Sequence, residues 1–172
     1  MKLYKKIIIL LNLVLVVVLF NFSVWKKEKV LAEGNMVLLQ LAPVDPRSLM
    51  QGDYMELRYD FGITEAMHTP AAKRGFCVIK TDANKVGRAV RFQTGPTPLH
   101  EGEQLLRYHR SEFDLHLGAE SYFFEEGTAE SFINARYGGL RVDDKGNSIL
   151  VGLYDEQRRL IVPGEGKVRT IK

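Results

Sequence analysis

The sequence predicts a mainly β domain, barrel-like or sandwich-like with one short helix, preceded by a single N-terminal transmembrane helix. Three observations support this fold class. One uncharged apolar run covers residues 7–25, later segments alternate apolar and polar side chains at the period of a strand, and turn signals separate these segments. A chain of 172 residues, 45% of them hydrophobic, is long enough for one such domain beside the helix.

The apolar run at residues 7–25 contains no charged side chain, and only Asn12, Asn21 and Ser23 interrupt it. A helix of this length covers roughly 28 Å, close to the ~30 Å hydrocarbon thickness of a bilayer. Lysines flank both ends, and Trp25 lies at the C-terminal boundary, where an amphipathic ring favours the membrane interface. We therefore interpret the run as a membrane span that binds the lipid bilayer.

Retention and orientation of this span are separate questions. Residues 30–32 (Val-Leu-Ala) offer small side chains to a signal peptidase, but the apolar run exceeds the ~7–15 residues of a signal sequence and lysines follow it. We expect an uncleaved anchor. Lysines are equally numerous on both sides, and the short tail at residues 1–6 favours an N-terminus inside. The remaining domain is then expected outside the cytoplasm.

The basic residues are concentrated at the N-terminus. The chain has 24 Lys and Arg against 21 Asp and Glu, and residues 1–30 contain six of these lysines and one glutamate. The rest therefore has 18 basic and 20 acidic residues, so we expect no nucleic-acid partner. The predicted organisation is a basic tail at 1–6, the anchor at 7–25, a juxtamembrane linker at 26–34 and a β-rich domain at 35–172.

The domain is expected to begin with a strand at 37–41 that ends at Pro43. A short helical turn should follow, with Asp45 as its N-cap and Gly52 as its exit. The clearest strand covers 54–61, where one face is apolar and the other polar; the apolar face is formed by Met55, Leu57, Tyr59 and Phe61.

Further elements follow at short intervals. We expect a hairpin of 76–81 with 89–93, a loop at 95–98, strands at 105–113 and 116–124, and a helix of about ten residues after Gly127. A final hairpin should join 140–142 to 149–151 over a turn in which Gly146 suits a bulge.

The clearest strand contains a motif. Residues 52–59 fit the pattern G-D-Y-x-x-L-x-Y at every specified position, and blocks at 118–127 and 142–147 follow in order; the motif residues are Gly52, Asp53, Tyr54, Leu57 and Tyr59. Over roughly residues 28–155 the chain resembles the GDYXXLXY family of bacterial membrane-anchored proteins. This family is uncharacterised. Its members resemble accessory proteins found beside polytopic membrane proteins, which implies an integral membrane partner.

Leu57 and Tyr59 are interpreted as core residues of the motif, whereas Asp53 and Tyr54 allow two interpretations. Asp53 accepts hydrogen bonds within a turn while Tyr54 packs at the sheet edge, or both contact a partner. Glu126 is a further candidate partner contact. With no activity indicated, we expect a binding module for an integral membrane partner, and a cell-envelope ligand sensor is one alternative.

The other alternative is a Ser/Lys hydrolase resembling type I signal peptidases, which are also single-span anchors with a β-rich domain. Ser48 precedes Gly52-Asp53, and Lys73 lies downstream as a candidate base. The spacing between the serine and Gly-Asp is about half that of those enzymes, and the expected motif near the lysine is missing. We therefore assign no catalytic residue and treat Ser48 and Lys73 as weak candidates.

No cofactor or metal is expected. The acids at Glu120, Glu125, Glu126 and Glu130 are explained by helix capping and surface charge rather than by paired-carboxylate catalysis. The four histidines have no metal-ligand spacing, although His109 and His116 could meet across adjacent strands. Cys77 stands alone, which excludes an internal disulfide.

Overall fold

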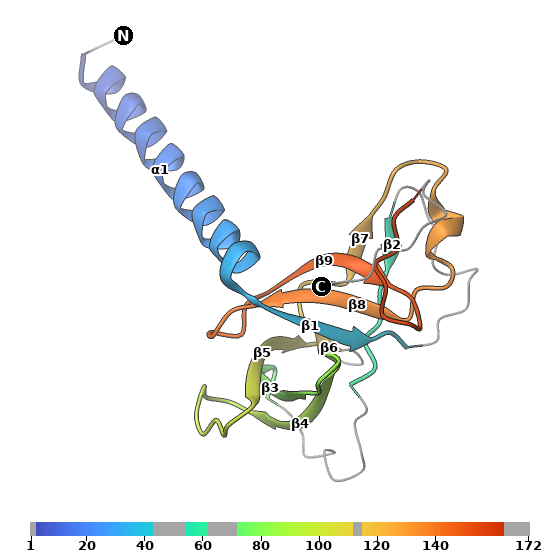
Figure 1. Ribbon diagram of the computed structural model, residues 1–172. Coiled ribbons are helices and arrows are strands. Elements are labelled where there is room, and N and C mark those ends of the chain that lie inside the picture. The colour runs from blue at the N-terminus through green and yellow to red at the C-terminus, as the bar shows by residue number, and fades with distance from the viewer. Residues whose placement is uncertain (1–2, 43–53, 62–71, 112–114, 164–172) are drawn as a thin grey trace.

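The fold is a long helix followed by a β-rich domain of three antiparallel sheets (Figure 1). A computed structural model describes residues 3–42, 54–61, 72–111 and 115–163. Within these ranges no sheet closes into a barrel. The predicted fold class, an apolar N-terminal helix before a mainly β region, is confirmed.

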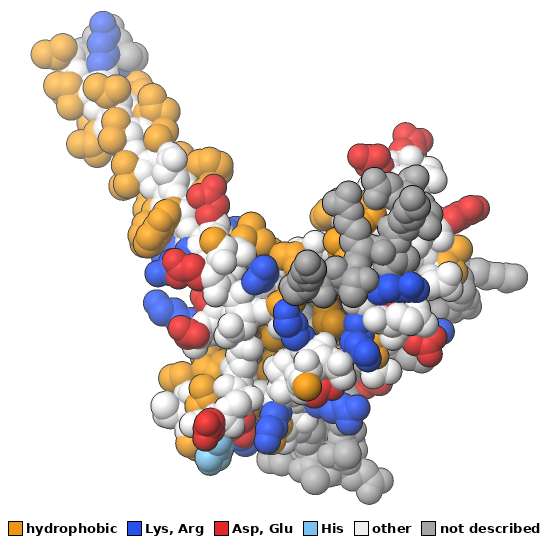
Figure 2. Space-filling model, viewed as in Figure 1, with side chains coloured by type: hydrophobic (Ala, Val, Ile, Leu, Met, Phe, Trp, Pro, Cys, Tyr) orange, Lys and Arg blue, Asp and Glu red, His pale blue; other side chains and the backbone are white. Residues whose placement is uncertain are grey.

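Helix α1 covers Leu3–Glu33 and is long and apolar enough to cross a membrane. It contains the run at 7–25 and continues without a break to Glu33, through all but the last residue of the linker expected at 26–34. Its apolar side chains are exposed on all sides, and Val30 alone among its described residues is buried. Figure 2 shows this apolar surface along the helix and charged side chains near the domain.

Three sheets form the domain. The first has the order β1-β8-β9, from Asn35–Gln40, Tyr137–Val142 and Ser148–Tyr154. The second has the order β4-β3-β5-β6, from Gly87–Gln93, Arg74–Thr81, Glu103–Arg110 and Leu115–His116. The third pairs β2 (Tyr54–Glu56) with β7 (Ser121–Phe123).

The main core lies between the first two sheets. Its buried residues include Val37, Leu39, Leu140 and Val142 from one sheet, and Cys77, Ile79, Leu106 and Tyr108 from the other. A smaller core joins the third sheet to β9 and consists of Met55, Leu57, Phe132 and Leu153. The centres of β1 and β3 are buried on both faces, and Leu38 of β1 packs with Val86 and Tyr154 in a third cluster on the side away from this core.

Both predicted hairpins are confirmed. Asp82 shapes the β3–β4 turn because its Oδ1 accepts the backbone N–H groups of Asn84 and Val86, at 2.8 and 2.9 Å. Asp143 does the same in the β8–β9 turn, accepting from Lys145 and Asn147. Gly146 has a φ of +78°, as the bulged turn requires.

Two expected elements are wrong. The single strand at 116–124 is divided into β6 and β7, because Gly118 has a φ of +77° and the Glu120 carboxylate accepts the backbone N–H groups of Leu117 and Gly118. The ten-residue helix is a single 3-10 turn at Ala129–Phe132. The backbone N–H of Arg136 instead donates to Tyr154, so pairing with the sheet overrides the helical spacing.

The strand expected at 54–61 is shorter in the structure than the alternation of apolar and polar side chains predicts. Regular pairing ends at Glu56, but Met55, Leu57 and Phe61 are buried as the alternation predicts. The capped turn expected at 45–52 lies outside the described residues.

Candidate functional site

The second half of the family motif, Leu57 and Tyr59, fixes the motif strand within the fold. The Tyr59 hydroxyl donates a hydrogen bond of 2.5 Å to the carbonyl of Ala119, and the Leu57 N–H donates to the carbonyl of Glu120 at 2.6 Å. The Tyr59 ring lies against Gly138, where a Cβ would stand 2.9 Å from the ring. Leu57 and Tyr59 therefore fix the motif strand to the segment before β7, as core residues.

Burial keeps the Tyr59 hydroxyl protonated. Desolvation, and next the charge of the Glu120 carboxylate, raise the pKa of Tyr59 far above its ordinary value. The group is thus a permanent hydrogen-bond donor in the protein interior.

Tyr54, the residue of the first half of the motif that the structure describes, lies at the surface. Tyr54 pairs with Phe123 across β2 and β7, and their ring centroids are 5.7 Å apart. Tyr54 is 42% exposed and Phe123 is 73% exposed. Ile133, next to the buried Phe132 of the same small core, is also exposed. We call the exposed pair of Tyr54 and Phe123 the aromatic end of the domain.

The structure describes two of the remaining predicted site residues, Glu126 and Lys73. Glu126 is exposed in the segment after β7, and Lys73 is exposed immediately before β3. A lysine that acts as a general base needs a desolvated position, which Lys73 lacks. Ser48, Gly52 and Asp53 lie outside the described residues, so their roles stay predictions.

His109 and His116 do meet across β5 and β6, as their strand positions suggested. They are register partners, and their rings stack with centroids 5.0 Å apart. Among the described residues, no group of three or more His, Cys, Asp or Glu side chains is placed to hold a metal ion.

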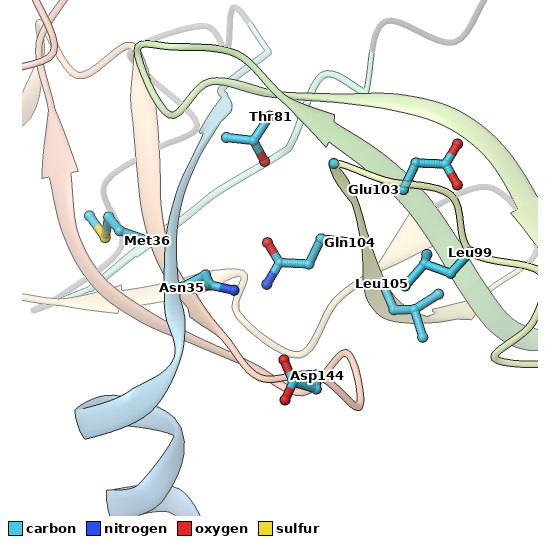
Figure 3. Close-up of a pocket in the computed structure, with 9 residues that line it drawn as sticks. Asn35, Met36, Thr81, Leu99, Glu103, Gln104, Leu105 and Asp144 are labelled. Atoms are coloured by element: carbon cyan, nitrogen blue, oxygen red, sulfur yellow. The ribbon is translucent and has the colours of Figure 1, made fainter.

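A groove of about 570 Å³ lies beside the start of β1 (Figure 3). It is bounded by the β4–β5 loop, the start of β5 and the β8–β9 turn; its lining consists of Asn35, Met36, Thr81, Leu99, Gly102, Glu103, Gln104, Leu105 and Asp144. None of these was a predicted site residue. The groove forms between segments far apart in the sequence, and no local motif marks it.

One acid in this groove is already paired. Glu103 accepts two hydrogen bonds from the Arg91 guanidinium, at 2.5 and 2.8 Å, and one from the backbone N–H of His100. These contacts, the Arg91 hydrogen bond first, lower the pKa of Glu103 to about 2. Glu103 therefore holds the β4–β5 loop in place.

The junction of helix and domain is tightly built. Val30 is buried where α1 meets β8 and β9, and the N–H of Gly34 donates to the Val30 carbonyl at 2.9 Å. The Arg141 guanidinium donates to the Gly34 carbonyl at 2.8 Å. Strand β1 begins at Asn35, directly after this contact. The helix thus passes into the sheet with a single intervening residue.

Comparison with known proteins gives one match. The family model described as GDYXXLXY protein matches residues 16–153, most of the chain. Neither the curated proteins nor the solved structures include a significant match. The matched range contains the C-terminal half of α1, the motif strand and all three sheets except the last residue of β9. The chain therefore belongs to the GDYXXLXY family.

Proposed function

We propose that this chain is a single-span, membrane-anchored accessory protein whose β-rich domain binds an integral membrane protein in the same bilayer. The observation that carries this proposal is the junction. Helix α1 runs unbroken from the apolar segment to Glu33, and its last turn is packed on β8 and β9 through Val30. The domain is thereby held close to the membrane. We propose the orientation expected from the short N-terminal tail, with the N-terminus inside and the domain outside the cytoplasm.

The same junction favours retention of the anchor. Ala32 lies in the last turn of α1, between the buried Val30 and the Gly34 carbonyl held by Arg141. Cleavage after Ala32 would remove part of the packed junction. Near the end of the apolar run, the Lys26 Nζ lies 4.5 Å from the centroid of the Phe22 ring, and the Lys29 Nζ lies 5.9 Å from that of the Trp25 ring. Such cation–aromatic pairs suit the membrane interface.

Confinement to the bilayer explains how a small contact surface would suffice. Two proteins held in one membrane meet at a high effective concentration, so weak contacts produce substantial occupancy. The aromatic end offers such a surface, because Tyr54 and Phe123 expose large side chains that a soluble domain usually buries. Asp53 and Glu126 remain proposed contacts near it in sequence.

Anchoring is tested by extracting native membranes with alkaline carbonate and measuring the intact mass of the chain. We expect the protein in the membrane pellet with residues 1–32 present. Recovery of a shortened chain in the supernatant would contradict the anchor.

Partner binding is tested with a photo-crosslinking amino acid at position 123, in intact cells. We expect adducts with an integral membrane protein. The same substitution at Val90, which is 42% exposed on β4, provides the control. Identical adducts from both positions, or none from position 123, would contradict binding through the aromatic end.

The groove favours a second candidate function, ligand sensing in the cell envelope. Its volume of about 570 Å³ lies within the ~300–1,000 Å³ of small-molecule sites. A soluble envelope component that binds there should raise the unfolding temperature of the full chain in detergent. The rise should disappear when Leu99, which lines the groove, is replaced by Asp.

A further inference from the structure

The two asparagines of α1 lie on opposite sides of the helix. They are nine residues apart, which at ~100° per residue is about two and a half turns. Each donates one amide hydrogen to the carbonyl four residues earlier: Asn12 to Ile8 at 3.0 Å and Asn21 to Val17 at 2.8 Å. The amide oxygen and second hydrogen have further bonding capacity. Hydrocarbon offers them no partner, so a helix that approaches either face with a polar group is favoured.

Each asparagine is flanked by apolar residues at heptad spacing. The Asn21 face is formed by Ile7, Leu10, Val14, Val17, Asn21 and Val24. The Asn12 face is formed by Ile8, Asn12, Leu15, Leu19 and Phe22. On the Asn21 face, β-branched residues occupy the positions equivalent to Asn21 one and two heptads earlier. β-branched residues with one asparagine at such positions are features of parallel two-stranded coiled coils; of the alternate positions, where leucine is preferred, Leu10 matches and Val17 and Val24 do not.

The position of the domain distinguishes the two faces. Val30 follows Asn12 by 18 residues, about five complete turns, so both lie on the same side of α1. Because Val30 is buried where α1 meets β8 and β9, these strands lie on the Asn12 side of the last helical turn. Two parallel copies joined through their Asn12 faces would turn β8 and β9 of each copy toward the other copy and crowd the interface. Copies joined through their Asn21 faces would place the domains on opposite outer sides.

We propose that the Asn21 face binds a second copy of this chain in the membrane, as a parallel two-helix pair. A two-fold axis parallel to the helices places identical residues at equal depth. The side-chain amide is both donor and acceptor, so each Asn21 satisfies the other. This inference rests on the membrane insertion stated under Proposed function, and it leaves the aromatic end of each copy free for the partner.

The test uses the full chain in native membranes with a single added cysteine. Val24→Cys lies on the Asn21 face, whereas Ser23→Cys lies on the Asn12 side at nearly the same depth. Cys77 is buried in the domain core and stays in both variants. Mild oxidation should produce a disulfide-linked dimer from Val24→Cys and little from Ser23→Cys.

The asparagines supply a matched pair of substitutions in the Val24→Cys chain. Asn21→Leu should weaken dimerisation about three- to thirtyfold, the range expected for one hydrogen bond between membrane helices. Asn12→Leu, an identical change at a similar distance from the other end of the span, should leave the dimer yield unchanged.

Several results would overturn the proposal. These are no dimer from Val24→Cys, equal dimer from both cysteine positions, or a dimer sensitive to Asn12→Leu and not to Asn21→Leu. Carbonate extraction of the same membranes separates this failure from failure of the proposed function. A chain that stays in the pellet without forming dimers overturns the pairing alone, whereas a chain released into the supernatant overturns the anchor as well.

Discussion

Arg141 in β8 fixes the residue that follows the helix: its guanidinium donates a 2.8 Å hydrogen bond to the carbonyl of Gly34, which lies 107 residues earlier in the sequence. The same stretch of β8 lies against Gly34, where an added Cβ would stand 3.0 Å from the backbone nitrogen of Val142. The direction of the helix relative to the domain is therefore set by contacts with β8, which is one of the last strands to be synthesised.

Gly34→Ala should disrupt this junction. The new Cβ would lie 2.4 Å from the Val30 carbonyl oxygen, a backbone atom of the helix that cannot move freely. Crowding of this kind costs about 1–3 kcal/mol. Urea unfolding of the full chain in detergent should show that loss. Gly95→Ala is the control, since its nearest atom is 3.9 Å away; equal effects of the two substitutions would contradict the junction described here.

Tyr59→Phe should destabilise the domain by about 1–2 kcal/mol, because the Ala119 carbonyl loses its buried donor. The ring would keep its packing against Gly138, so the fold should be retained. Tyr54→Phe is the control: it removes a hydroxyl from an exposed ring and should change the unfolding free energy by less than about 0.5 kcal/mol. A cost for Tyr54→Phe as large as that for Tyr59→Phe would argue against the distinction between the two motif tyrosines.

Glu103 should make stability depend on pH in the acid range. Its pKa is about 2 in the folded protein, against 4.5 for an ordinary glutamate. Between these values the unfolded chain binds more protons at this site, so the stabilisation is present above pH 4.5 and is lost as the pH falls through 2. Glu103→Gln should flatten this part of the stability curve, measured as urea midpoints at successive pH values. The same change at the exposed Glu101 should leave the curve unaltered.

Cys77 should resist thiol reagents in the folded protein. Its side chain is fully buried, and desolvation raises the pKa of the thiol to about 12. Because the thiolate is the reactive form, a water-soluble disulfide reagent should label no cysteine under native conditions and one after denaturation. Rapid labelling of native protein would mean that the sheet interface opens readily. Orientation in the membrane must consequently be measured with an added surface cysteine.

Several parts of the fold are predictable because their causes are local. The asparagine- and glycine-containing turns at Asn84 and Gly146 are made by side chains within a few residues, and the alternation around Met55 and Leu57 survives even where regular strand pairing ends. The segment around Ile133 is the opposite case. Its apolar residues do have helical spacing. The backbone N–H of Arg136, however, donates its hydrogen bond to the Tyr154 carbonyl in the sheet, so the helix does not continue.

The candidate site divides in the same way. The alternation of the strand placed Tyr59 on the apolar face and Tyr54 on the polar face, whereas the hydrogen bond from Tyr59 to Ala119 depends on a contact between distant segments that the motif does not encode. The groove near Asn35 had no signal in the sequence, because its walls come from four separate segments.

The sequence by itself determined that an apolar helix precedes a β-rich domain of this family, since apolar run length and strand periodicity depend on neighbouring residues alone. The tertiary structure decided how the two parts are joined. Val30 is buried and Gly34 is held because β8 returns to them from more than a hundred residues away. That contact gives the helix a side that faces the domain and a side that does not, and periodicity within the helix carries no information about which is which.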